Sequence, residues 1–254
     1  MNVTLSGATV WAATCLLLAT AQEAPGQIRV AAASDLQAAL PDLIARFEKE
    51  TGLSARATFG SSGNFFTQIQ NGAPFDVFLS ADIDYPRRLQ AAGLGKDVTL
   101  YATGRLVLWT RHDSGIDVRN GLASIADPRV RRIAIANPQH APYGRAAASA
   151  LRRQGIYDAV ASRLVFGDNI AQTAQFVQSG NADVGIIALS LTSAPALKVA
   201  GTFVEIPASL HPPIEQGAIV LAGARDAAAA RRFVQFLVSA ETRRYLADAG
   251  FDAP

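Results

Sequence analysis

The sequence predicts an α/β protein of two lobes, each built on a mixed, mostly parallel sheet with helices on both faces, joined at a hinge. Short apolar runs alternate with amphipathic helical patterns along most of the chain, as in βα units that pair into parallel sheets. This alternation forms two series, the second beginning at Arg132. The 254 residues exceed a typical domain of about 150, and 50% hydrophobic residues against 17% charged residues can fill two cores.

The first series begins with a predicted strand over 27–33 and an amphipathic helix over 35–51. Pro41 should kink or restart this helix because proline lacks a backbone N–H, and Gly52 occupies the position of a C-terminal glycine cap. The further elements of this series are strands over 53–59, 75–80, 99–101 and 106–110 and helices over 64–70 and 83–92.

The second series continues to the end of the chain with strands over 132–136, 164–166, 184–188 and 217–221 and helices over 145–153, 170–179, 227–238 and 241–249. We expect the last two helices to return to the first lobe. Lobe I then comprises residues 22–104 and 217–254, and lobe II comprises residues 105–216. The hinge is expected near 103–104 and 213–217.

The first 21 residues are predicted to be a cleaved secretory signal peptide, which directs the mature protein out of the cytoplasm. They contain no charged side chain, and the apolar stretch over 10–21 is too short to span a bilayer. It ends in the cleavage pattern Ala19-Thr20-Ala21. The usual basic start is missing, since the first basic residue is Arg29, so a buried N-terminal helix is the alternative. Cleavage would remove Cys15, the only cysteine, and leave no disulfide.

The charge pattern argues against a nucleic-acid-binding protein. The 23 basic and 21 acidic residues give a net charge of +2, and no basic run exceeds two neighbours. The three histidines show no metal-ligand spacing. Three aspartates could suggest a cation site, but we expect them to cap the neighbouring helix and hold its loop. The histidines are His112, His140 and His211, and the aspartates are Asp76, Asp82 and Asp84.

Four strand-to-helix junctions, two in each lobe, are the candidate binding site. Helix N-termini present unpaired N–H groups and a partial positive charge, and ligands of such sheets bind at the carboxyl ends of strands. Four termini facing one cleft would form a site for a small anion. The junctions are 31–36, 59–64, 137–144 and 167–170.

Helix capping alone is the alternative at each junction. Ser34 with Gln37 matches a capping box, and either Ser61 or Ser62, and either Asp168 or Asn169, could be an N-cap. The junctions contain no lysine, and their nearest arginine is Arg145. Since carboxylates and phosphate esters commonly use a bidentate arginine, a site of hydroxyls and N–H groups favours a fully deprotonated oxyanion.

Seven segments, in order and spacing, resemble the periplasmic molybdate-binding proteins of ABC transporters. They are 30–36 (VAAASDL), 59–63 (FGSSG), 72–82 (GAPFDVFLSAD), 135–144 (IANPQHAPYG), 167–170 (GDNI), 180–190 (GNADVGIIALS) and 211–214 (HPPI). The resemblance covers nearly the whole chain after the signal peptide. It implies a two-lobed periplasmic binding protein-like fold that closes on molybdate or tungstate.

The resemblance also implies the ligand-binding residues. Ser34 and Ser62 would contact the oxyanion through their hydroxyls, Tyr143 and Ile170 through their backbone N–H groups, and Asp35 would contribute as well. Molybdenum would be held through its oxygens by these residues, with no direct cation ligand.

Two positions depart from the family pattern. Some members have a ligand-binding tyrosine where this chain has Ala188, a hydroxyl that Tyr143 would replace. A carboxylate at Asp35 would repel a dianion, so we expect it to point to solvent and to the helix end.

The expected function is therefore capture of molybdate or tungstate by a monomeric solute-binding protein that delivers it to the membrane permease of an ABC transporter. No catalytic residue, cofactor or nucleic-acid partner is expected. The alternatives are a binding protein for another tetrahedral oxyanion, sulfate or phosphate, and a hydrolase on a similar fold. A ligand-sensing module of a regulator should carry a DNA-binding segment, which this sequence does not show.

Overall fold

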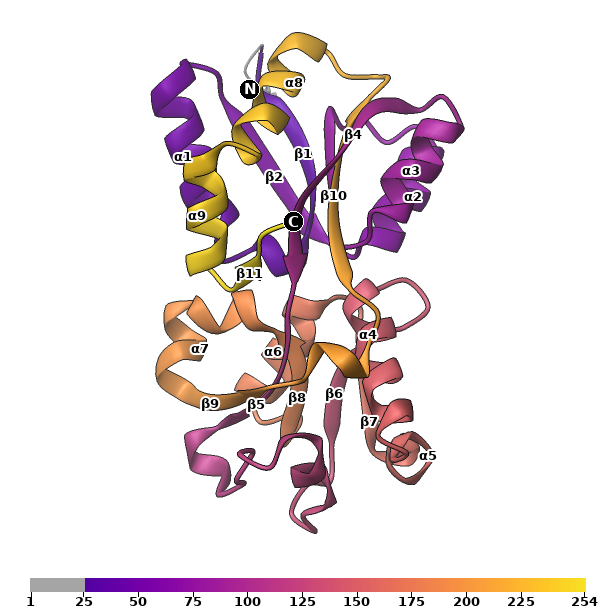
Figure 1. The fold of residues 1–254 in the computed structure, drawn as a ribbon, viewed down its shortest axis with the longest axis vertical. Helices are drawn as coiled ribbons and strands as arrows, with labels where there is room; N and C mark the ends of the chain where they lie inside the picture. Colours follow the sequence, from indigo (N-terminus) through magenta and orange to yellow (C-terminus); the bar gives the residue numbers. More distant parts are fainter. Residues whose placement is uncertain (1–25) are drawn as a thin grey trace, which may run out of the picture.

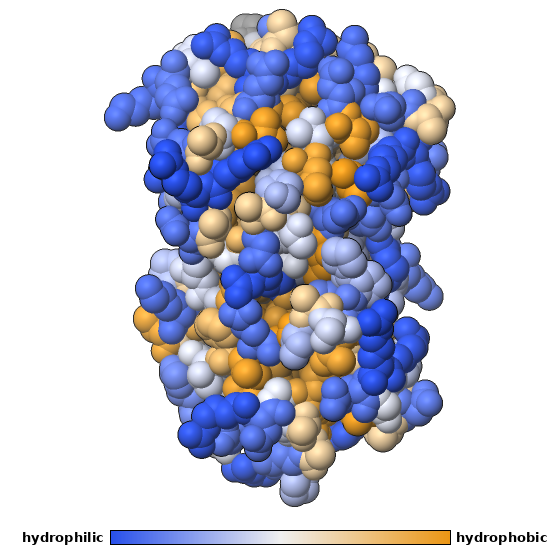
Figure 2. Space-filling view, viewed as in Figure 1, coloured by the Kyte–Doolittle hydropathy of each residue, from blue (hydrophilic) through white to orange (hydrophobic). Residues whose placement is uncertain are grey.

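The chain folds into two α/β lobes, each centred on one mixed sheet (Figure 1). The computed structural model describes residues 26–254, so the predicted signal peptide and Cys15 lie outside the described residues. A space-filling view shows hydrophilic side chains over the ends and flanks of both lobes and a narrower waist between them (Figure 2). Within residues 26–254, no helix is long and apolar enough to cross a membrane.

The first lobe contains a six-stranded sheet of order β11-β4-β10-β3-β1-β2. Its strands are β1 (Ile28–Ala33), β2 (Ala55–Gly60), β3 (Val77–Ser80), β4 (Gly95–Gly104), β10 (Ile214–Leu221) and β11 (Phe251–Asp252). Its helices are α1 (Leu40–Thr51), α2 (Ser62–Gln70), α3 (Asp84–Ala91), α8 (Ala227–Leu237) and α9 (Ala240–Asp248). Helices α1, α8 and α9 share one apolar cluster with the sheet, and α2 and α3 share another, so both faces are covered (Figure 1).

The second lobe contains a five-stranded sheet of order β7-β6-β8-β5-β9. Its strands are β5 (Leu106–Arg111), β6 (Ile133–Ala136), β7 (Leu164–Gly167), β8 (Val184–Ala188) and β9 (Gly201–Glu205). Its helices are α4 (Pro142–Arg153), α5 (Tyr157–Val160), α6 (Ile170–Gln178) and α7 (Pro195–Ala200). One large apolar cluster holds this sheet and its helices together.

Both sheets are mixed, as predicted, but antiparallel pairing is more prominent than expected. Strands β1, β2 and β3 pair in parallel, as do β6, β7 and β8. The antiparallel pairings all involve the strands β4, β5, β9 and β10, at the ends of the chain segments that pass between the lobes, or β11 at the C-terminus. The antiparallel part of each sheet therefore consists mainly of the strands that lead into or out of the crossings between the lobes.

The helix predicted over 35–51 is divided in two. A short 3₁₀ turn, η1, spans Ser34–Leu36, and α1 begins only at Leu40 with Pro41 in its first turn. Proline is well placed there, because first-turn N–H groups have no intrahelical acceptor. Gly52 ends α1 with φ 70°, the left-handed conformation expected of a C-terminal glycine. The Pro41 restart and the Gly52 cap are therefore confirmed.

The chain crosses between the lobes twice, from β4 to β5 around Arg105 and from β9 to β10 after Glu205 (Figure 1). At the first crossing a Cβ on Gly104 would lie 2.1 Å from the Tyr143 hydroxyl oxygen. Only glycine lets the crossing strand pass so close to a side chain of the other lobe. Strand β10 begins at Ile214, three residues before the predicted start at Gly217.

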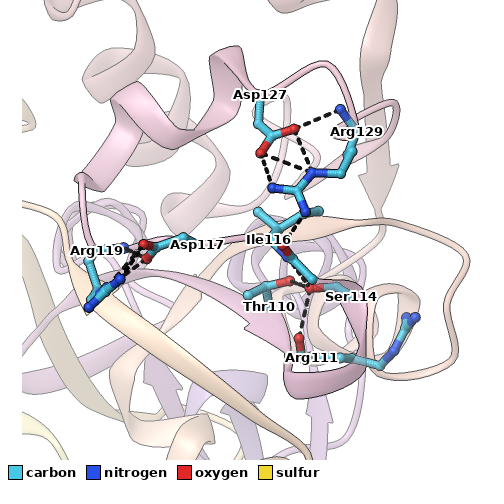
Figure 3. Close-up of polar contacts among 9 residues, drawn as sticks. Thr110, Arg111, Ser114, Ile116, Asp117, Arg119, Asp127 and Arg129 are labelled. Carbon is cyan, nitrogen blue, oxygen red and sulfur yellow. Dashed lines mark hydrogen bonds and ion pairs between the residues drawn. The ribbon is translucent and has the colours of Figure 1, made fainter.

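A long connection from β5 to β6 lies at the far end of the second lobe (Figure 1) and is held by local polar contacts (Figure 3). The Thr110 and Ser114 hydroxyls are 2.9 Å apart, and the Arg119–Asp117 and Arg129–Asp127 ion pairs measure 2.7 and 2.6 Å. These contacts order the loop without involving the face of the lobe that meets its neighbour.

Candidate functional site

The four predicted junctions meet where the two lobes face each other. Ser34 follows β1, Ser62 begins α2, Tyr143 is the second residue of α4, and Ile170 begins α6. Their exposed fractions are 3%, 1%, 2% and 4%, so all four residues are buried. Each junction is close to a junction of the other lobe, as the following contacts show.

Direct hydrogen bonds link the junctions across the lobe boundary. The backbone N–H of Ala171, in the first turn of α6, donates to Ser34 Oγ at 3.4 Å. At the second link the His140 carbonyl oxygen accepts from the Gly63 N–H at 2.9 Å and from Ser61 Oγ at 2.6 Å. A Cβ on Gly63 would lie 2.5 Å from that carbonyl oxygen, so the approach requires glycine.

Two of the three capping expectations fail, for the same physical reason. Ser34 caps nothing with its side chain, and the Gln37 N–H bonds instead to the Ser34 carbonyl oxygen at 3.2 Å. Ser61 is at the N-cap position of α2, yet its hydroxyl donates to His140 in the other lobe, and Ser62 Oγ accepts from the Ala81 N–H at 2.9 Å. These hydroxyls are used in contacts between distant segments rather than in local capping.

The third capping expectation is confirmed for Asn169. Its Oδ1 accepts from the Gln172 N–H at 2.9 Å and fixes the first turn of α6. The Ala171 and Thr173 N–H groups are bound to Ser34 Oγ and to the Asn169 carbonyl oxygen. Ile170, the first residue of α6, has an N–H without an intrahelical acceptor because of its position. The helix therefore presents this N–H and its positive end at the lobe boundary.

The Asp35 carboxylate does not point to solvent, which corrects the sequence-based expectation. Asp35 is fully buried, and neither carboxylate oxygen makes a well-aligned hydrogen bond. The second lobe covers it, since Ser190 Oγ donates to the Asp35 carbonyl oxygen at 2.8 Å. The helix end that was expected to receive the carboxylate is absent, because α1 begins five residues later at Leu40.

Burial raises the pKa of Asp35 from 3.8 to about 6. The Tyr143 hydroxyl, the Gln216 side chain and the backbone N–H groups of residues 35 and 36 lie near the carboxylate and oppose this rise. Their effect is smaller than that of desolvation, which disfavours the charged form. The site therefore contains a carboxyl group that changes charge close to neutral pH.

Two further residues of the site were not predicted. Tyr101 on β4 donates its hydroxyl hydrogen to Gln216 Oε1 at 3.1 Å, and Gln216 Nε2 on β10 donates to the Tyr143 hydroxyl at 3.5 Å. Burial raises the pKa of both tyrosines well above 10, so both stay protonated. The one sequence signal was a glutamine directly before the apolar run over 217–221. Ala188, where a tyrosine was considered, is a buried residue at the end of β8.

The arginine nearest the junctions and the nearby aspartates bind other residues of the protein. Arg145 pairs with Asp82 and with the Tyr85 hydroxyl instead of facing the junctions. Asp82 Oδ1 accepts from the Asp84 N–H at 2.9 Å, and Asp76 binds Arg29 at 2.7 Å, so the expected loop-holding role is confirmed. The expected capping role is not, because the N-cap position of α3 is Ile83 and no side chain forms a cap hydrogen bond there. Among residues 26–254, no group of three or more His, Cys, Asp and Glu side chains could hold a metal ion.

Histidine side chains also have contacts that need no ligand. His140 Nδ1 lies 3.0 Å from Ser61 Oγ, and His211 Nδ1 lies 2.8 Å from the Pro212 carbonyl oxygen. The His140 side chain thus contacts the first-lobe loop beside the site.

The sequence is similar to those of known solute-binding proteins. The family described as bacterial extracellular solute-binding protein matches residues 28–252. The molybdate-binding protein ModA of Azotobacter vinelandii is 39% identical over 240 residues, 93% of each chain. ModA of Rhodobacter capsulatus is 35% identical over 231 residues, 90% of this chain and 89% of the relative.

A solved structure agrees in fold as well. The periplasmic molybdate-binding protein of Azotobacter vinelandii matches with a TM-score of 0.83 at 33% identity, covering 89% of this chain and 99% of that chain. The two-lobed binding-protein fold predicted from the sequence is thereby confirmed. From the match over residues 28–252 and the identity to these relatives, the chain belongs to the family of bacterial extracellular solute-binding proteins.

Proposed function

We propose that the protein captures molybdate or tungstate between its two lobes and delivers the oxyanion to the membrane permease of an ABC transporter. The observation that carries this proposal is the meeting of four strand-to-helix junctions, two from each lobe, with buried serines and helix N-termini. As a member of a solute-binding family, the chain is a binding protein and not an enzyme. The names of its relatives as molybdate-binding proteins support the choice of ligand.

The proposed contacts use neutral donors. Ser34 and Ser62 offer hydroxyls, and Tyr143 and Ile170 offer first-turn N–H groups that have no intrahelical acceptor. Asp35 contributes its backbone N–H beside Ser34. A dianion with four acceptor oxygens suits such donors. The molybdenum is held only through its oxygens, and no cofactor takes part.

The two lobes close around the ligand in this proposal. Lobe I consists of residues 22–104 and 217–254, lobe II consists of residues 105–216, and the crossing segments act as the hinge. The separate sheets support this division, since β4 ends at Gly104 and β5 begins at Leu106. At the second crossing β10 already pairs with β4 from Ile214 onward, so residues 214–216 of the proposed lobe II join the first-lobe sheet.

The place and partners of the protein form part of the same proposal. Residues 1–21 are a cleaved signal peptide, and the mature protein acts in the periplasm as a monomer, without a nucleic-acid partner. The description of the solved relative as periplasmic supports this location. The near-equal numbers of basic and acidic residues, 23 and 21, agree with the absence of a nucleic-acid partner.

Calorimetry of the purified protein against molybdate, tungstate, sulfate and phosphate tests the proposal. Molybdate and tungstate have the same charge and nearly the same size, so one set of donors should bind both with similar affinity. Sulfate has shorter bonds and cannot reach all donors at once. It should bind at least about tenfold more weakly, a difference of about 1.4 kcal/mol. Sulfate or phosphate binding as tight as that of molybdate would assign the site to another tetrahedral oxyanion.

A further inference from the structure

An arginine of the second lobe reaches across to the first lobe beside the site. The Arg145 guanidinium, on α4, binds the Asp82 carboxylate through Nη2 and donates through Nη1 to the Tyr85 hydroxyl at 3.2 Å. Its Cζ atom also lies 5.5 Å from the centroid of the Tyr85 ring. Asp82 precedes α3 and Tyr85 lies in its first turn, so all three contacts join the two lobes.

The contacts are built onto the elements that carry the site. Asp82 follows Ala81, whose N–H donates to Ser62 Oγ at 2.9 Å, and Arg145 lies two residues after Tyr143 on α4. The Asp82 carboxylate is held in place, because its Oδ1 accepts from the Asp84 N–H at 2.9 Å. Arg145 can therefore meet Asp82 only when the Ser62 and Tyr143 junctions have come together.

The surroundings suit a contact that forms and breaks. Arg145 and Asp82 line a cavity of about 320 Å³ between the lobes, together with Asp84, Arg87 and Glu215. Their side chains are 39% and 28% exposed, so water can hydrate both charges when the pair separates. A partly exposed ion pair contributes little to the stability of a fold, but it can bias two conformations that differ little in free energy.

We infer that Arg145, Asp82 and Tyr85 form an interlobe latch that favours the closed arrangement of the lobes and slows release of the bound oxyanion. Where it concerns release, the inference rests on the proposed function. The latch contacts no ligand. It acts by adding an ion pair, a hydrogen bond and a cation–π contact that exist only in the closed arrangement.

The test compares Arg145→Met, Asp82→Asn and their double variant with Arg87→Met. The control removes an ion pair of the same kind, Arg87–Asp84 at 3.0 Å, which lies in the same cavity but within α3. Two readouts are used: the radius of gyration without ligand, from X-ray scattering, and the rate of molybdate release when tungstate is added in excess.

Loss of the latch should raise the radius of gyration in Arg145→Met and speed molybdate release about three- to tenfold, as expected for one exposed ion pair and one cation–π contact. Asp82→Asn should lie between this variant and the wild type, because Tyr85 still binds Arg145. The double variant should release no faster than Arg145→Met, since both changes remove one interaction. Arg145→Lys keeps the charge and should restore part of the effect.

Equal radii and equal release rates in Arg145→Met and Arg87→Met would overturn the latch. The latch would also be overturned if the effects of Arg145→Met and Asp82→Asn on the release rate added in full in the double variant. Failure of the proposed function would look different, because the wild-type protein would then bind no molybdate. The radius of gyration measured without ligand would still decide whether the latch exists.

Discussion

The hydroxyls of Ser34 and Ser62 are neutral donors from two separate junctions of the first lobe. If they hold the oxyanion, Ser34→Ala and Ser62→Ala should each weaken molybdate binding about ten- to a hundredfold, because a hydrogen bond to a charged group contributes about 1.5–3 kcal/mol. The double variant should lose more, without full additivity, since both hydroxyls contact one ion. Calorimetry measures the dissociation constants.

Ser179→Ala is the matched control for these variants, because its hydroxyl bonds to the Phe176 carbonyl oxygen at the surface. Its affinity for molybdate should equal that of the wild type. Unchanged affinity in both Ser34→Ala and Ser62→Ala would mean that the oxyanion binds elsewhere.

Asp35 makes the free energy of unfolding depend on pH. Its pKa rises from 3.8 to about 6 on folding, so the folded protein holds this proton more tightly than the unfolded chain. The stability linked to this proton is fully present below about pH 4 and is lost as the pH rises through about 6. At pH 7 the ionised carboxylate is buried, at a cost of roughly 3 kcal/mol from about two pKa units.

Asp35→Asn should therefore raise the free energy of unfolding at pH 7, by up to roughly 3 kcal/mol. The asparagine keeps an oxygen that can accept from the Tyr143 hydroxyl or Gln216. The gain should shrink as the pH falls from 6 to 4. Urea unfolding of both proteins across this range measures it, and a difference that does not change with pH would contradict the role assigned to burial.

At the scale of a helix, the N-cap of α6 connects stability with binding. Asn169→Ala removes the side-chain acceptor of the Gln172 N–H and should lower the free energy of unfolding by about 1 kcal/mol. Because α6 presents the Ile170 N–H at the proposed site, the loosened first turn should also weaken molybdate binding about three- to tenfold.

Asp226→Ala is the control for this helix, since Asp226 caps α8 by accepting from the Ala228 and Ala229 N–H groups, in the first lobe away from the junctions. It should lose similar stability but keep its affinity. Thermal unfolding and calorimetry on both variants separate the two effects. Equal losses of affinity would mean that α6 has no special part in binding.

Elements with a strong local pattern were predictable from the sequence. Leu40, Leu43 and Phe47 are buried on one face of α1, as their spacing indicated, and the strand over 184–188 has the predicted bounds. The unpredicted elements lack such patterns. Strand β9 is a short strand at the edge of its sheet. Strand β11 consists of two residues, and it pairs with β4, which lies more than a hundred residues earlier in the sequence.

The candidate site also has features that the sequence predicts and features that it does not. The strand-to-helix junctions that contain Ser34, Ser62, Tyr143 and Ile170 follow from the order of elements, so a sequence can indicate them. The choice of these four residues within the junctions came from the family resemblance. The direction of a side chain depends on the other lobe. Ser61 turns to His140, and the burial of Asp35 beside Tyr143 and Gln216 comes from elements distant in the chain. Local capping rules could not foresee these choices.

At the scale of the whole molecule, two sheets joined by crossing segments should move as bodies about those crossings. Adding molybdate should lower the radius of gyration measured by X-ray scattering, because the ligand binds donors from both lobes at once. Sulfate at the same concentration, below its own dissociation constant, is the control and should leave the radius unchanged. A radius that stays constant at saturating molybdate would contradict closure.

The way the chain runs through the two sheets has a consequence for how the protein acquires its structure. The five-stranded sheet uses one continuous stretch, β5 to β9, whereas the six-stranded sheet needs β10 and β11 to join strands that precede that stretch. Ordering the intervening stretch first shortens the effective loop that must close before β10 can pair with β3 and β4. In pulsed hydrogen exchange during refolding, amides of β6 and β8 should gain protection before those of β10. Simultaneous protection would show a single concerted step. If protection appears in this order, the lobe that is inserted in the chain folds first and the interrupted lobe is completed afterwards.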